Sequence, residues 1–218
     1  MKREPRDHLS WEGGTVSAAW HGEGGDTLLA LTHSAGGTYE TPALVAYAEA
    51  MAARGTQVVR FNLPYVEAGK KTPGPQARDE ACWRDVADAL RPRAKRLLLG
   101  GRSYGGRMAT HVVADGVTCA GLVLLAYPLH PPGKPERLRT AHLERIMAPM
   151  LFLQGTRDPF ADPTLLARAL AQLPGATRHR LEGGDHGHKV AGRTVAEVAA
   201  ELADATVQWL ATAVGRSA

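Results

Sequence analysis

The sequence has no apolar run long enough to cross a membrane, and it has very little cysteine. A membrane-spanning helix needs about 20 consecutive apolar residues, and polar residues interrupt every apolar stretch before that length. Residues 1–8 carry mixed charge and no apolar core, so we expect no secretory signal. The two cysteines, Cys82 and Cys119, are too few for a disulfide framework. These absences predict a cytoplasmic protein with no membrane partner.

Aromatic residues are also scarce, and the positive charge is spread out. Phe, Trp and Tyr make up 6% of the 218 residues, whereas there are 24 glycines, a composition that favours helices packed closely on a sheet. The net charge of +4 comes mostly from scattered arginines, and the densest basic stretch, residues 91–96, contains no aromatic residue to stack on a base. We therefore expect no nucleic-acid partner. The length and the 44% hydrophobic content predict one domain over residues 1–218.

Short apolar runs alternate with segments of helical periodicity along most of the chain. This alternation predicts an α/β fold with a mostly parallel central sheet and helices on both faces. Residues 8–20 differ, because Gly13 and Gly14 predict a hairpin turn between two strands. A short helix is expected over residues 138–146, and Val195 is expected to face the core from the last helix. The predicted buried strands are residues 27–33, 57–61, 96–100, 122–126, 150–153 and 177–181.

The strongest local motif is a G-x-S-x-G sequence formed by Gly101, Ser103 and Gly105. It lies between a predicted strand and a predicted helix, where a tight turn holds the serine hydroxyl clear of its neighbours. The helix that follows directs its N-terminal N–H groups at the same place, which suits a developing oxyanion. A phosphate-binding loop is excluded because no Lys-Ser/Thr pair follows Gly106. The pattern predicts Ser103 as a catalytic nucleophile, and a glycine turn needed only for packing is the alternative.

A serine nucleophile requires a base and an acid that orients the base, and both are found downstream in the expected order. Asp158 directly follows the predicted strand at residues 150–153, at the strand end where open α/β sheets place their sites. His186 lies in a glycine-rich loop after the last predicted strand, and it is preferred as the base over His188. Asp185 is interpreted as a turn residue, and Asp162 as a helix N-cap.

The oxyanion hole of such a site is built from backbone N–H groups. The loop after the strand at residues 27–33 holds Ser34 and Ala35, whose small side chains let the backbone approach a substrate. The residue after the nucleophile, Tyr104, is expected to supply the second donor. Nucleophile, acid, base and oxyanion loop therefore occur in one consistent chain order.

These residues resemble the α/β-hydrolases, and most closely a small, lidless branch related to the dienelactone hydrolases. That branch includes testis-expressed hydrolase-like proteins and a chromatin-complex subunit. The resemblance implies Ser103 as nucleophile, Asp158 as acid and His186 as base, although dienelactone hydrolases themselves have cysteine at the nucleophile position. It is carried by residues 32–37, 101–107, 127–135, 154–160 and 184–186, of which 127–135 is the most specific.

The predicted function is cleavage of a small-molecule carboxylic ester or thioester, with no cofactor and no bound metal. The connection between the strands at residues 122–126 and 150–153 is too short for a lid, which predicts an open site and a small acyl group. His33, Arg102 and His130 are candidate substrate-binding residues, and anchoring of the elbow is the alternative for Arg102. Two other functions stay open, a non-catalytic scaffold and a metal-dependent hydrolase using Asp185, His186 and His188. The sequence gives no oligomeric state.

Overall fold

Eight strands form one sheet in the computed structural model, which describes residues 6–214. The strand order is β1-β2-β4-β3-β5-β6-β7-β8, and only the β1–β2 and β2–β4 pairs are antiparallel. The prediction of a mostly parallel sheet is therefore confirmed, as is the hairpin near the start of the chain. The strands are β1 (Arg6–Trp11), β2 (Gly14–His21), β3 (Thr27–Thr32), β4 (Gln57–Phe61), β5 (Arg96–Arg102), β6 (Gly121–Leu125), β7 (Met150–Gly155) and β8 (Ala176–Leu181).

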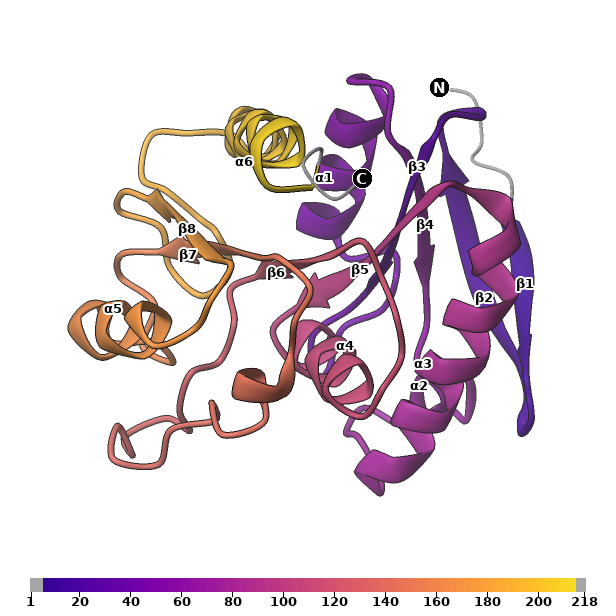
Figure 1. Cartoon of the computed structure of the whole chain (residues 1–218), viewed down its shortest axis with the longest axis horizontal. Helices are drawn as coiled ribbons and strands as arrows, with labels where there is room; N and C mark the ends of the chain where they lie inside the picture. Colours follow the sequence, from indigo (N-terminus) through magenta and orange to yellow (C-terminus); the bar gives the residue numbers. More distant parts are fainter. Residues whose placement is uncertain (1–5, 215–218) are drawn as a thin grey trace.

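Helices cover both faces of this sheet, which explains why its inner strands are almost continuously apolar. In β3, Leu28 and Ala30 face one hydrophobic cluster, whereas Leu29 and Leu31 face the other. Figure 1 shows α1 and α6 together on one side of the sheet and the remaining α-helices on the opposite side. The helices are α1 (Pro42–Ala52), α2 (Pro64–Glu67), α3 (Gln76–Leu90), α4 (Tyr104–Ala114), α5 (Pro163–Ala171) and α6 (Val195–Trp209).

Several helix starts follow from the local sequence. The side chain of Asp162 accepts hydrogen bonds from two N–H groups in the first turn of α5, which confirms it as the N-cap. Thr194 and Glu197 form a reciprocal capping box at the start of α6. Thr41 precedes Pro42 at the start of α1, but its side chain makes no capping hydrogen bond.

Two local predictions are wrong. Residues 138–146 form no α-helix, and only a 3₁₀ turn, Leu143–Arg145, is present. Tertiary contacts fix this segment instead, because the Tyr127 hydroxyl donates to the carbonyl of Arg139 and the His142 ring bonds the Thr110 hydroxyl. Val195 does not face the core, since 47% of it is exposed at the first turn of α6. The short helix α2 was not predicted.

The parallel arrangement brings the loops after β3, β5, β7 and β8 to the same edge of the sheet. Residues 126–149, between β6 and β7, contain no α-helix, so nothing of the size of a lid domain lies there.

Among residues 6–214, no helix combines the length and the apolar character needed to span a membrane. The prediction of one domain over residues 1–218 includes both chain ends outside the described residues, and it stays a prediction.

Candidate active site

Ser103 lies at a strained turn between β5 and α4. Its backbone has φ 52° and ψ −112°, a left-handed conformation that a non-glycine residue rarely adopts. The turn is held because the flanking glycines touch neighbouring backbone. A Cβ on Gly101 would lie 2.5 Å from the carbonyl oxygen of Thr32, and a Cβ on Gly105 would lie 2.6 Å from that of His33. Both glycines of the motif are therefore required sterically.

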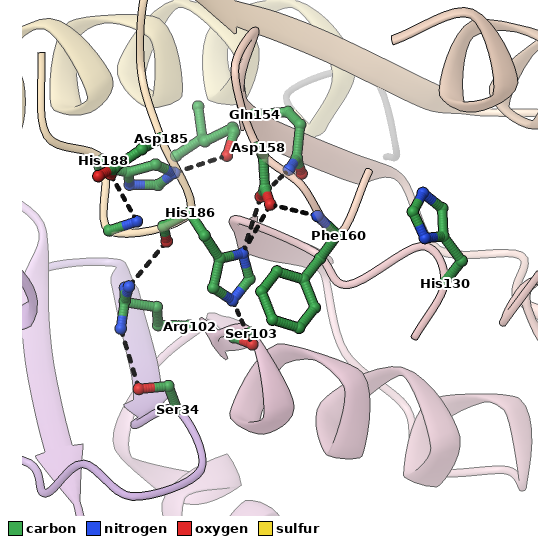
Figure 2. A network of polar contacts seen from close by, with 12 residues as sticks. Ser34, Arg102, Ser103, His130, Gln154, Asp158, Phe160, Asp185, His186 and His188 are labelled. Carbon is green, nitrogen blue, oxygen red and sulfur yellow. Dashed lines mark hydrogen bonds and ion pairs between the residues drawn. The ribbon is translucent and has the colours of Figure 1, made fainter. Parts of the chain in front are cut away.

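The structure brings Ser103, His186 and Asp158 into one hydrogen-bonded chain (Figure 2). His186 Nε2 lies 2.9 Å from Ser103 Oγ, and His186 Nδ1 lies 2.8 and 3.0 Å from the two oxygens of Asp158. Because an ionised carboxylate only accepts hydrogen bonds, Nδ1 carries the hydrogen. Nε2 is then free to accept the hydrogen of the Ser103 hydroxyl.

The Asp158 carboxylate is held by two further donors. Gln154 Nε2, near the end of β7, lies 2.6 Å from one oxygen, and the backbone N–H of Phe160 donates to the other at 2.8 Å. Asp158 is 4% exposed, so water does not compete strongly for these oxygens. The Phe160 ring packs on the His186 imidazole with 4.2 Å between ring centres. These contacts fix the orientation of both the carboxylate and the imidazole.

The alternative base, His188, lies on the same loop but points elsewhere. Its ring is buried, and Nε2 donates to the carbonyl of Leu153 at 3.1 Å. Burial lowers the pKa of His188 to about 4, so the ring stays neutral near pH 7. Asp185 accepts hydrogen bonds from the N–H groups of Gly187 and Lys189, as expected of a turn residue. Within residues 6–214, no cluster of three or more His, Cys, Asp or Glu side chains is arranged to hold a metal.

The expected oxyanion donors lie on two elements beside Ser103. Tyr104 is the first residue of α4, where a backbone N–H has no partner within the helix. Its hydroxyl donates to the buried Asp79 carboxylate at 2.7 Å, and burial raises the pKa of Asp79. Ser34 and Ala35 follow β3, and the carbonyl of Ser34 accepts from the N–H of Gly37 at 2.9 Å. The loop is thus closed by its own backbone bond.

Backbone groups bond both ring nitrogens of His33 and of His130. Nδ1 of His33 bonds the carbonyl of Ser34, and Nε2 accepts from the N–H of Leu63. His130 has the same arrangement, with Nδ1 at the carbonyl of Pro131 and Nε2 accepting from Asp162. Both rings are buried, and Figure 2 shows His130 apart from the Ser103 network. These bonds tie the histidines to neighbouring loops, and their role in substrate binding stays a prediction.

Arg102 joins the oxyanion loop to the histidine loop. Its Nη1 donates to Ser34 Oγ at 2.9 Å, and its Nη2 donates to the carbonyl of His186 at 2.7 Å (Figure 2). Burial lowers the pKa of Arg102 below its ordinary value, yet a guanidinium remains charged near neutral pH. These contacts fit the alternative in which Arg102 anchors the elbow.

Gln154 and Phe160 contact the network of Ser103, His186 and Asp158, although the sequence predicted no role for them. Gln154 lies four residues before Asp158, at the end of a predicted strand. That position could have indicated a contact with Asp158. Phe160 had no such signal, because its contact with His186 joins loops 26 residues apart, and only the folded chain brings them together.

Residues 25–212 match the family described as an alpha/beta hydrolase domain, which is most of the chain. The chain belongs to the α/β hydrolase family. Solved structures with the same fold include an α/β serine hydrolase without a lid from Xanthomonas campestris (21% identity, 96% of each chain covered, TM-score 0.74). A dienelactone hydrolase from Anabaena variabilis is similar at 16% identity (96% of this chain and 97% of that one, TM-score 0.74). An esterase from Pyrococcus furiosus is similar at 13% identity (98% and 92%, TM-score 0.78).

The family assignment confirms the predicted fold and the prediction of a hydrolase. The relation to dienelactone hydrolase-like proteins is confirmed at the level of fold. The narrower resemblance to testis-expressed proteins and a chromatin-complex subunit stays a prediction.

Proposed function

We propose that this hydrolase cleaves small carboxylic esters or thioesters through an acyl-enzyme intermediate. The observation that carries the proposal is the unbroken hydrogen-bonded chain from Ser103 Oγ through His186 to Asp158. Serine hydrolases and esterases among the proteins of the same fold support it. We assign Ser103 as nucleophile, His186 as general base and Asp158 as the group that orients and stabilises the imidazole.

In the proposed reaction, Ser103 Oγ attacks the acyl carbon while its proton passes to His186 Nε2. The backbone N–H of Tyr104 and the N–H groups of Ser34 and Ala35 stabilise the oxyanion that forms on the carbonyl oxygen. His186 then returns the proton to the departing alcohol or thiol as the bond to the acyl carbon breaks. In the second half of the cycle, a water molecule attacks the acyl carbon while His186 takes its proton. The bond to Ser103 Oγ then breaks, the carboxylic acid product leaves, and His186 returns the proton to Ser103 Oγ.

The proposed substrate is small because little of the chain can cover it. Residues 126–149 carry no α-helix above the site, so a long acyl chain would gain few contacts there. We expect kcat/KM for p-nitrophenyl acetate and butyrate to exceed that for the palmitate ester at least tenfold.

Initial rates with the short esters, with the rate of Ser103→Ala protein subtracted, test the proposal. The subtraction removes ester hydrolysis by buffer and by surface amines. Equal rates for the native chain and Ser103→Ala contradict the proposed triad chemistry and favour the scaffold alternative.

A further inference from the structure

A cavity of about 340 Å³ lies between the N-terminal halves of α1 and α6. Leu44 and Tyr47 of α1 and Val198 and Leu202 of α6 form much of its lining. This volume is near the lower end of the range of about 300–1,000 Å³ found for small-molecule sites. Val195, exposed at the first turn of α6, also lines it.

This cavity is separate from the proposed active site. Neither Ser103 nor His186 lines it, and Arg102 is the side chain that both places share. The guanidinium of Arg102 bridges Ser34 Oγ and the carbonyl of His186 (Figure 2). Arg102 therefore contacts both the cavity and the two loops beside the catalytic serine.

The charges around the cavity are positive. Arg102 and Lys189 line it, and no Asp or Glu is among the lining residues. The hydrogen-bond partners of Arg102 within residues 6–214 are uncharged oxygens, and its buried Nε has no partner there. Asp158 and Asp185 act on Arg102 at longer range, with oxygens already bound to other donors. A half-buried cation without a contacting carboxylate favours an anion nearby.

The start of α1 adds to this preference. Thr41 and Pro42 line the cavity, and the Thr41 side chain does not cap the first N–H groups of the helix. An uncapped helix N-terminus carries partial positive charge, which adds to that of Arg102 and Lys189. The cavity therefore combines apolar walls from two helices with positive charge from three sources.

We propose that this cavity is a second ligand site, which binds a small aliphatic carboxylate. The apolar tail lies between α1 and α6, and the carboxylate is directed toward Arg102. Because the site is separated from Ser103, binding does not require an active triad, and the proposal stands or falls independently of the proposed reaction.

Calorimetric titration with sodium octanoate at low ionic strength tests this site in the full chain. We expect one octanoate per chain, with the same affinity in Ser103→Ala as in the native protein. 1-Octanol has the same tail without the charge, and octylamine carries the opposite charge, so both are expected to bind at least tenfold more weakly. Failure of octanoate to bind, or equal affinity for octanoate and octanol, overturns the proposal.

Pairs of substitutions that differ only in charge, at two residues lining the cavity, locate the ligand. Val195→Asp and Val195→Asn have nearly the same shape and differ in charge, and both are compatible with the exposed first turn of α6. We expect the Asp variant to bind octanoate at least fivefold more weakly than the Asn variant, because the new carboxylate repels the ligand. Ala43→Glu and Ala43→Gln provide the same comparison from α1, with thermal melting as the check on folding. Equal affinities within both pairs overturn the assignment.

A crystal structure of the octanoate complex gives the position directly. Density between α1 and α6 with the carboxylate toward Arg102 supports the second site. Density for octanoate beside Ser103 instead contradicts it and identifies the ligand as a product bound in the active site.

Discussion

Replacing His186 with glutamine is expected to lower kcat for a short ester about 10⁴-fold or more, with the fold intact. His186 Nε2 lies 2.9 Å from Ser103 Oγ, and in the proposed mechanism no other group within reach takes the serine proton. A glutamine amide cannot accept and return a proton near neutral pH, so the acyl-enzyme would form only by the slow attack of an unactivated hydroxyl. Steady-state rates and thermal melting on the same preparations measure the effect.

Two histidine variants serve as controls for this prediction. His179→Gln removes a partly exposed ring that pairs with Glu201 on α6, so kcat is expected to remain within about twofold. His188→Gln removes the buried ring bonded to Leu153, and we expect kcat to fall less than tenfold in protein that remains folded. If His188→Gln abolished activity and His186→Gln did not, the assignment of the base would be wrong.

Replacing Gly105 with alanine is expected to lower the free energy of unfolding by about 3 kcal/mol. Alanine in place of a helical glycine ordinarily stabilises a protein by up to about 1 kcal/mol, so the expected sign is reversed. The added methyl group would lie 2.6 Å from the carbonyl oxygen of His33 and 2.7 Å from the Thr32 side chain. Relief requires α4 to move away from the loop after β3, which also displaces Ser103.

Urea denaturation measures this change, and Gly74→Ala is the matched control. Gly74 is exposed, and a Cβ there would meet no atom within 4 Å, so its substitution is expected to change stability by less than about 0.5 kcal/mol. If Gly105→Ala were as stable as Gly74→Ala, the close approach of α4 to β3 would not be what requires glycine in this motif.

Much of the fold was predictable because the burial of a strand on both faces requires a recognisable apolar pattern in its sequence. Strands such as β3 and β6 are covered on both faces, so they appear as continuous apolar runs. The N-cap residue Asp162 indicated the start of α5. The helix predicted over residues 138–146 is absent although Leu143 and Ile146 have helical spacing. Contacts with Tyr127 and Thr110 hold that segment in a non-helical conformation with one 3₁₀ turn.

The site was predictable to the extent that its chemistry is tied to strand ends. Ser103, Asp158 and His186 each follow a strand, and the parallel direction of these strands brings such residues to one edge of the sheet. Contacts between loops produce no comparable sequence pattern, so the packing of Phe160 on His186 was not predicted. The bonds that Leu63 and Asp162 donate to the rings of His33 and His130 were not anticipated for the same reason.

Labelling with a fluorophosphonate probe tests the central claim most directly, because the probe reacts covalently with a serine that a neighbouring base activates. We expect the intact protein to be labelled at one site, identified by mass spectrometry as Ser103, and Ser103→Ala to be unlabelled. Ser10→Ala, which removes an exposed hydroxyl on β1, is the matched control and is expected to retain labelling. Labelling that persists in Ser103→Ala, or that is absent from the folded native protein, would contradict the proposed nucleophile.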